Sequence, residues 1–375
     1  MAGIYIHIPF CRQACTYCNF HFSTLLAQKA TILQAIKREI ELTALMSPQE
    51  TIETIYFGGG TPSLLLPEEI ENIFQALRQK FIISDQAEIT LEANPDDITL
   101  LALQQWKTLT INRLSLGVQS FNEAELKWMN RAHSAAQSLQ SIHEISAAGV
   151  TNFSVDLIFG SPLLTNEDFK KNIETVLGLG VPHVSAYALT VEPKTILHSH
   201  ILSKKTVPVD EVRQAEQFVL LVEMMEAAGY EHYEISSFAK PGFRSKHNSS
   251  YWRGTPYYGF GPSAHSYDGN NKRRWNIANN ALYQKSIENN TLPCEEEILT
   301  PTQQLNEYIM IGLRTIEGLD MTVVASRFGE DKVGVISKIA ESFISQQLLV
   351  KDHQRLALTK KGKFLADGIA ADLFF

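Results

Sequence analysis

Short apolar runs recur along the first half of the chain, and stretches with helical periodicity separate them. The runs are rich in β-branched residues and cover residues 4–8, 54–57, 88–92, 113–116, 152–157 and 183–189. Between them, segments such as 27–45 and 67–81 repeat apolar side chains every three or four residues, as helices with one buried face do. Strands that alternate with helices form a parallel sheet, and six such units are fewer than the eight of a closed barrel. The pattern predicts an α/β fold with a partial (β/α)6 barrel over residues 1–235.

The pattern changes twice after residue 235. Residues 236–300 are rich in Gly, Tyr, Trp, Asn and His and show no strong helical period, so we expect loops and short strands that close the open side of the barrel. Residues 301–375 predict helices at 303–314, 321–328 and 333–346. A hairpin of 348–350 and 356–358, which turns at Asp352 and His353, follows them. This order predicts a small C-terminal domain that resembles a winged helix.

The charge of the chain argues against the DNA-binding role that a winged helix suggests. The net charge is −8, and residues 301–375 contain nine basic and nine acidic side chains. A DNA-binding domain needs a basic face, so we predict no nucleic-acid partner. No apolar run approaches the ~20 residues that span a bilayer, and the N-terminus lacks the charged and apolar regions of a signal peptide. We therefore expect no transmembrane segment and a cytoplasmic protein with reduced thiols.

Three of the four cysteines lie within eight residues, directly after the first predicted strand. Cys11, Cys15 and Cys18 have the spacing C-x3-C-x2-C. Clustered cysteines in a reducing compartment indicate metal binding, and thiolates at this spacing can converge on one 4Fe–4S cluster. Such clusters normally take four cysteines, so three leave one iron open to a chelating ligand such as S-adenosylmethionine (SAM). A structural zinc site with Cys294 as the fourth ligand is the alternative.

The cysteine loop resembles the signature of the radical SAM superfamily, including the aromatic Tyr17 before the third cysteine. The run from Tyr5 to Cys11, Tyr-Ile-His-Ile-Pro-Phe-Cys, resembles the HemN/HemW family, whose members include oxygen-independent coproporphyrinogen III oxidases and heme chaperones. The resemblance covers nearly the whole chain and implies a 4Fe–4S cluster on Cys11, Cys15 and Cys18.

The resemblance also implies a SAM site at the carboxyl ends of the strands, where open α/β sheets carry their chemistry. Gly58 to Gly60 follow the second strand, where consecutive glycines let a ligand approach the backbone. We expect Glu92, Gln119 and Asp156 at the ends of the third, fourth and fifth strands, with Arg131 on the helix after the fourth. Taken alone, such residues are often only helix caps or solvated charges. The residues implied to bind one or two SAM molecules are Tyr5, Gly59, Gly60, Thr61, Glu92, Gln119, Arg131 and Asp156.

Two departures from the oxidase pattern favour a heme carrier. The oxidases have a further cysteine two residues after the third, where this chain has Phe20, and a long segment before the cluster loop, where this chain has ten residues. The segment His247-Asn248-x-x-Tyr251-Trp252 resembles the HNxxYW motif linked to heme handling in the family. A neutral imidazole is a good axial ligand of heme, so we expect His247 to help hold heme, with a buried hydrogen-bonded histidine as the alternative.

His265 is a weaker candidate for the same role, and Cys294 is more often core filler than a heme ligand. The sequence thus predicts a radical SAM heme chaperone that passes heme to acceptor proteins and takes electrons from a reductant such as flavodoxin or ferredoxin. The alternative is an oxygen-independent coproporphyrinogen III oxidase, which decarboxylates propionate side chains.

Overall fold

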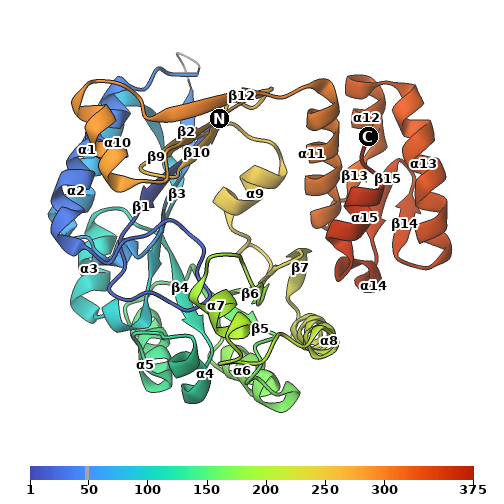
Figure 1. Ribbon diagram of the computed structural model, residues 1–375, viewed down its shortest axis with the longest axis horizontal. Helices are drawn as coiled ribbons and strands as arrows, with labels where there is room; N and C mark the ends of the chain where they lie inside the picture. The colour runs from blue at the N-terminus through green and yellow to red at the C-terminus, as the bar shows by residue number, and fades with distance from the viewer. Residues whose placement is uncertain (47–49) are drawn as a thin grey trace.

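A large sheet of mainly parallel strands forms the body of the protein (Figure 1). The structure is a computed structural model that describes residues 1–46 and 50–375. Within these residues, twelve strands form one sheet in the order β12-β11-β10-β9-β1-β2-β3-β4-β5-β6-β8-β7. The six parallel strands at its centre are β1 (Ala2–Ile8), β2 (Thr51–Gly59), β3 (Ile82–Ala93), β4 (Arg113–Gln119), β5 (Phe153–Phe159) and β6 (His183–Ala188).

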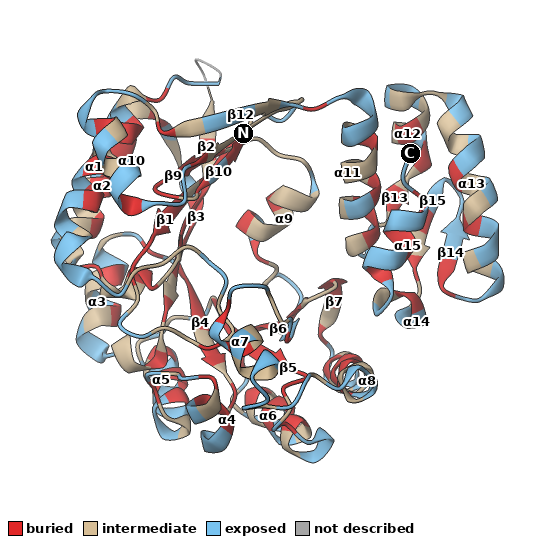
Figure 2. Ribbon diagram, in the orientation of Figure 1, coloured by how far each residue is buried: buried red, intermediate tan, exposed pale blue. Residues whose placement is uncertain are grey.

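Helices accompany these strands, and those that connect one strand to the next cover one face of the sheet (Figure 1). They are α1 (Lys29–Leu42), α2 (Pro67–Lys80), α3 (Leu100–Thr108), α4 (Glu123–Trp128), α5 (Ala135–Ala147), α6 (Asn166–Gly178), α7 (Ile196–Leu202) and α8 (Glu211–Ala227). Their inner faces and the strands are buried, whereas their outer faces are exposed (Figure 2). The predicted α/β fold with six βα units is confirmed.

Most of the predicted strands are shorter than the observed strands, which continue beyond the predicted boundaries. β3, for example, begins at Ile82, although apolar residues become frequent only from residue 87. The first residues of β3 are partly exposed and still pair with Thr51 and Ile52 of β2. Backbone pairing continues past the buried core, and a pattern of apolar side chains cannot show such an extension.

The segment after β6 adds strands to both edges of the parallel sheet. β7 (Glu231–Glu234) and β8 (Ser237–Ala239) extend the β6 edge in antiparallel fashion. β9 (Tyr257–Phe260) pairs parallel with β1, and β10 (His265–Tyr267), β11 (Lys272–Asn276) and β12 (Cys294–Ile298) continue outward.

The expectation that residues 236–300 contain only loops and strands was wrong, because two helices are present. α9 (Lys246–Trp252) is too short to show a period, and its first N–H groups are satisfied by the Ser245 hydroxyl and the Glu88 carboxylate. α10 (Asn280–Glu288) begins at an Asn279 cap and packs against α1.

One buried carboxylate ties α1 to this late segment. Glu39 of α1 accepts hydrogen bonds from the Gly261 N–H (2.8 Å), the Asn276 amide (2.6 Å) and the Tyr283 hydroxyl (2.6 Å). Burial raises the pKa of Glu39, and the three donors meet the hydrogen-bonding needs of a carboxyl group with no exposed surface. These hydrogen bonds therefore tie residues 261–283 to α1, near the N-terminal end of the chain.

The last 75 residues build a second hydrophobic core around a three-stranded antiparallel sheet. The elements are α11 (Pro301–Arg314), β13 (Leu319–Asp320), α12 (Met321–Phe328), α13 (Glu330–Ser345), β14 (Leu349–Asp352), β15 (Arg355–Leu358), α14 (Lys360–Lys363) and α15 (Ala366–Asp372). The three predicted helices and the hairpin are confirmed, and β13, α14 and α15 are additional. In the described residues, no helix has the length and apolarity to cross a membrane.

Candidate cofactor site

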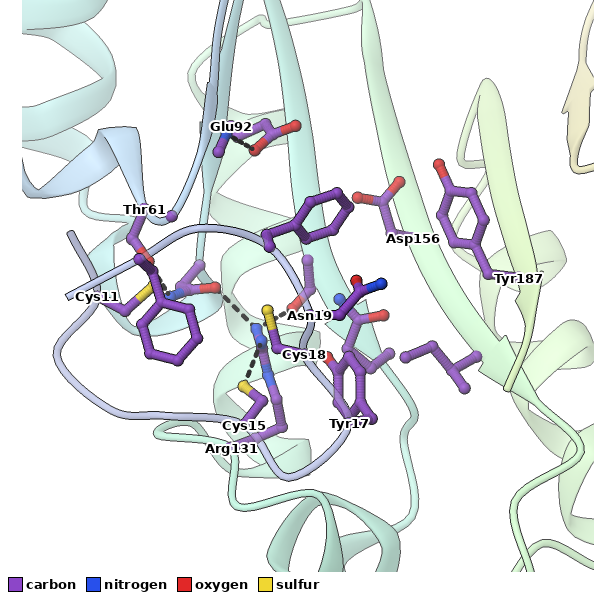
Figure 3. Close-up of a pocket in the computed structure, with 18 of the residues that line it drawn as sticks. Cys11, Cys15, Tyr17, Cys18, Asn19, Thr61, Glu92, Arg131, Asp156 and Tyr187 are labelled. Carbon is purple, nitrogen blue, oxygen red and sulfur yellow. Dashed lines mark hydrogen bonds between the residues drawn. The ribbon is translucent and has the colours of Figure 1, made fainter. Parts of the chain in front are cut away.

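A cavity of about 470 Å³ opens at the carboxyl ends of the parallel strands (Figure 3). We call it the main cavity. It is lined by the three cysteines after β1, the glycines after β2 and polar side chains from β3 to β6. The predicted residues that it brings together are Cys11, Cys15, Cys18, Gly59, Gly60, Thr61, Glu92, Gln119, Arg131 and Asp156.

The cysteine loop leaves β1 and lies across the mouth of the main cavity (Figure 3). The Thr61 hydroxyl donates to Cys11 Sγ (3.5 Å), and the Arg131 guanidinium donates to Cys15 Sγ (3.4 Å). Burial raises the pKa of Cys11 to about 11 and also raises that of Cys18. Thiols with raised pKa values need a cationic partner to ionise, and both an iron–sulfur cluster and Arg131 meet that need.

The chemistry of these donors fits an iron–sulfur cluster better than a single ion. Among the described residues, no three His, Cys, Asp or Glu side chains are arranged to hold one metal ion. The thiols instead line an open space that suits a bulky group. Cys294, the fourth ligand in the zinc interpretation, opens β12, which is the outermost strand beyond β9, and does not line the main cavity.

The glycines at the end of β2 bring the backbone close to the cysteine loop. Gly59 has φ +106°, a left-handed conformation that favours glycine. A Cβ on Gly60 would lie 2.5 Å from the Phe10 carbonyl oxygen, so only glycine fits there without a shift. The two strand ends can therefore approach closely, and the backbone between them faces the cavity.

Two carboxylates lie on the floor of the main cavity. Glu92 accepts hydrogen bonds from the Tyr56 hydroxyl (2.8 Å) and the Gly59 N–H (3.2 Å), and Asp156 accepts one from the Ser115 hydroxyl (3.3 Å). Burial raises the pKa of Glu92 to about 7 and that of Asp156 to about 6, and the Asp156 charge adds to the rise at Glu92. The floor thus favours a ligand that carries positive charge or donates hydrogen bonds.

Two expectations about placement were wrong. Arg131 lies in the loop between α4 and α5, not on a helix, and there it donates to the Asn94 side chain (2.7 Å) and the Gly117 carbonyl (2.6 Å). Its Nε has no hydrogen-bond partner. Asp156 lies in the middle of β5, not at its end, because the strand continues to Phe159.

Two residues of the cavity wall, Asn94 and Tyr187, were not predicted from the sequence. Asn94 holds Arg131 from the end of β3, and Tyr187 lies beside Asp156 near the end of β6 (Figure 3). Both lie at or near strand ends, where polar residues face the mouth of such a sheet. Their position at or near a strand end is the sequence feature that could have identified them.

Tyr5 lines a different, smaller cavity. This side cavity has a volume of about 410 Å³ and shares Asn19 and Phe20 with the main cavity. Its lining residues are Tyr5, His7, Asn19, Phe20, His21, Tyr251, Tyr257, Ser263 and His265. The structure therefore places Tyr5 in the side cavity with Tyr251 of α9 and Tyr257 of β9, although its ring also lies close to Glu92 of the main cavity.

His247 lies in neither cavity. It is buried in α9, with Nδ1 hydrogen-bonded to the Thr54 hydroxyl (2.8 Å) and Nε2 to the Tyr251 hydroxyl (2.9 Å), and its ring stacks on Tyr56. Burial lowers its pKa to about 3, so the ring is neutral. Neither ring nitrogen is free to bind iron in this arrangement.

Sequence comparisons identify the family. The Radical SAM superfamily matches residues 5–176, and the HemN C-terminal domain matches residues 299–365. The heme chaperone HemW of Bacillus subtilis is 32% identical over 98% of this chain and 98% of its own. The chain belongs to the HemW family of radical SAM proteins. HemW of Synechocystis is 35% identical over 94% of this chain and 88% of its own.

The fold agrees with this membership. Coproporphyrinogen III oxidase (HemN) from Escherichia coli covers 100% of this chain and 90% of its own, with a TM-score of 0.86 and 22% identity. At that identity the likeness shows a shared radical SAM fold. The HemN/HemW resemblance seen in the sequence is confirmed, and the cofactors of the superfamily are a 4Fe–4S cluster and SAM.

Proposed function

We propose that this HemW-family chain is a heme chaperone, which binds heme and transfers it to acceptor proteins. The observation that carries the proposal is full-length similarity to proteins named heme chaperones, over 98% of both chains in the B. subtilis case. Phe20 supports it, because an apolar side chain, 68% exposed, takes the place of the further cysteine of the oxidases.

In this proposal the three thiolates of Cys11, Cys15 and Cys18 hold the cluster at the mouth of the main cavity. When bound, a 4Fe–4S cluster can supply an electron that cleaves SAM to a 5′-deoxyadenosyl radical. Arg131 balances the thiolate charge through its contact with Cys15. A one-electron donor such as flavodoxin or ferredoxin would reduce the cluster.

The SAM-contacting groups are proposed from the remaining residues of the main cavity. Glu92 and Asp156 would accept hydrogen bonds from SAM, and the backbone of Gly59 and Gly60 would lie against it. Gln119 and Thr61 complete the polar rim. Tyr5 lies close to Glu92, on the far side of Gly58, and would contribute to SAM binding from there.

A paired assay on anaerobically reconstituted protein tests the function. One arm titrates heme and then adds an apo-hemoprotein acceptor, and the other supplies coproporphyrinogen III, SAM and a reductant. We expect heme binding and transfer, with no decarboxylated product. Product formation without heme transfer would favour the oxidase alternative and refute the proposal.

A further inference from the structure

The side cavity carries an unused imidazole beside aromatic walls. Three histidines line it, His7, His21 and His265. His7 is hydrogen-bonded at both nitrogens, to the Tyr5 hydroxyl (3.2 Å) and the His21 carbonyl (2.8 Å), and the His21 ring bonds to Asn280 (2.8 Å). Within the described residues, His265 alone of the three makes no side-chain hydrogen bond.

His265 is also the most exposed histidine of this set. Its side chain is exposed at the start of β10, and its ring stacks on Trp275 at 6.2 Å between centroids. Partial burial and Arg273 lower its pKa, so the ring is neutral near pH 7, the form that binds a metal. The pairing of β10 with β11 holds the backbone on which the ring sits.

The other walls offer faces for a flat apolar ring. Tyr251 and Tyr257 meet edge to face at 4.7 Å, and Phe20 presents an exposed aromatic side chain at the border with the main cavity. Aromatic faces bury large apolar ligands well. A single imidazole is too few ligands for a bare metal ion but is one axial ligand for a porphyrin iron.

We propose that heme docks in the side cavity, with His265 as an axial ligand and Phe20 against the macrocycle. The inference rests on the proposed chaperone function and names the heme site within it. The heme then lies beside the main cavity, separated from it by Asn19 and Phe20. His247 becomes a positioning residue, because its hydrogen bond to Tyr251 fixes one wall of the side cavity.

The test is a hemin titration of the full chain with its cluster content checked. His265→Ala removes the ligand, and His143→Ala removes another exposed histidine, on α5, far from either cavity. We expect His265→Ala to weaken heme binding by at least about tenfold and to shift the Soret band and spin state. Added imidazole should restore the parent spectrum, and His143→Ala should behave as the parent.

Two further variants distinguish the contribution of the axial ligand to heme binding from that of the aromatic side chains. Phe20→Ser should weaken heme binding without changing the ligand signature of the spectrum. His247→Gln should keep that signature, because Tyr251 moves but His265 does not. An unchanged affinity and spectrum in His265→Ala would overturn the inference and leave the chaperone function standing. A parent chain that binds no heme would overturn both.

Discussion

The main cavity and the side cavity meet at Asn19 and Phe20, but they are built in different ways. The main cavity takes its walls from the ends of successive parallel strands, all within the first 192 residues. The side cavity joins residues 5–21 to residues 251–265. In the first, most of the side chains lie on or just after strands whose ends are set by the sheet. In the second, contact depends on β9 pairing with β1 and on α9 docking against Glu88. A site built from strand ends is therefore visible in the sequence, whereas a site built from distant segments is not.

The largest effect expected in this comparison concerns the cysteines. Cys15→Ser should abolish the cluster, because two thiolates are left where three are needed, and iron should fall from about four per chain to almost none. Iron and sulfide analysis after anaerobic reconstitution measures this. Cys294→Ser should keep its iron and sulfide, since Cys294 lies outside both cavities. Loss of iron in Cys294→Ser would revive the four-cysteine interpretation.

The His247 and His265 side chains should differ in their contribution to stability. His247→Ala leaves the Thr54 and Tyr251 hydroxyls without a partner and opens a void, so unfolding should become easier by about 2–4 kcal/mol. His265→Ala removes an exposed ring and should change stability by no more than about 0.5 kcal/mol. Denaturant titration of the two variants measures the difference. Equal losses would show that His265 supports the fold.

Substitution of Asp156 in the main cavity should weaken SAM binding, whereas substitution of His265 in the side cavity should not. Asp156→Ala should weaken SAM binding by about 1–3 kcal/mol, the size of a hydrogen bond to a charged group. Calorimetry on reconstituted protein measures this, and His265→Ala, in the side cavity, is the matched control. If both variants lose SAM affinity, the two cavities act as one site.

Glu92 should contribute to the pH dependence of stability. Its folded pKa of about 7 lies above its usual value, so this side chain binds more protons in the folded chain than in the unfolded chain between these values. The stability that Glu92 contributes to the cofactor-free chain should therefore be lost as pH rises through this range, whereas buried histidines such as His247 contribute in the opposite direction. The stability of Glu92→Gln relative to the parent should therefore increase with pH, and the variant should have the higher thermal midpoint at pH 8. A parallel profile in the variant would show that other groups set the dependence.

The sequence predicted the fold and the main cavity well, for one physical reason. Parallel strands separated by helices place their carboxyl ends at one edge, so polar residues after the strands converge wherever each strand ends. The boundaries of the strands were predicted less well. β5 continues past its predicted end, and Asp156 therefore lies inside the strand. Arg131 was misplaced because an unrecognised turn separates α4 from α5.

The side cavity could not be predicted in the same way. Nothing in the periodicity of residues 236–300 shows that β9 pairs with β1, because parallel pairing across the chain depends on tertiary contacts. The segment around the His247 motif forms one wall of the side cavity, but the His247 ring is hydrogen-bonded to two hydroxyls. The unoccupied ring, His265, lies after the next strand.

The central position of β1 also has a consequence for the order in which the protein is made. Gly3 pairs with Tyr257 and Ile6 with Phe260, so one edge of the first strand stays open until most of the chain has left the ribosome. The hydrogen-bond donors of Glu39, which are Gly261, Asn276 and Tyr283, are likewise synthesised late. A nascent chain carries its cluster cysteines early, while the strands beyond β9 are still missing. The cysteine loop is thus synthesised well before β9 and β10, which complete the neighbouring side cavity.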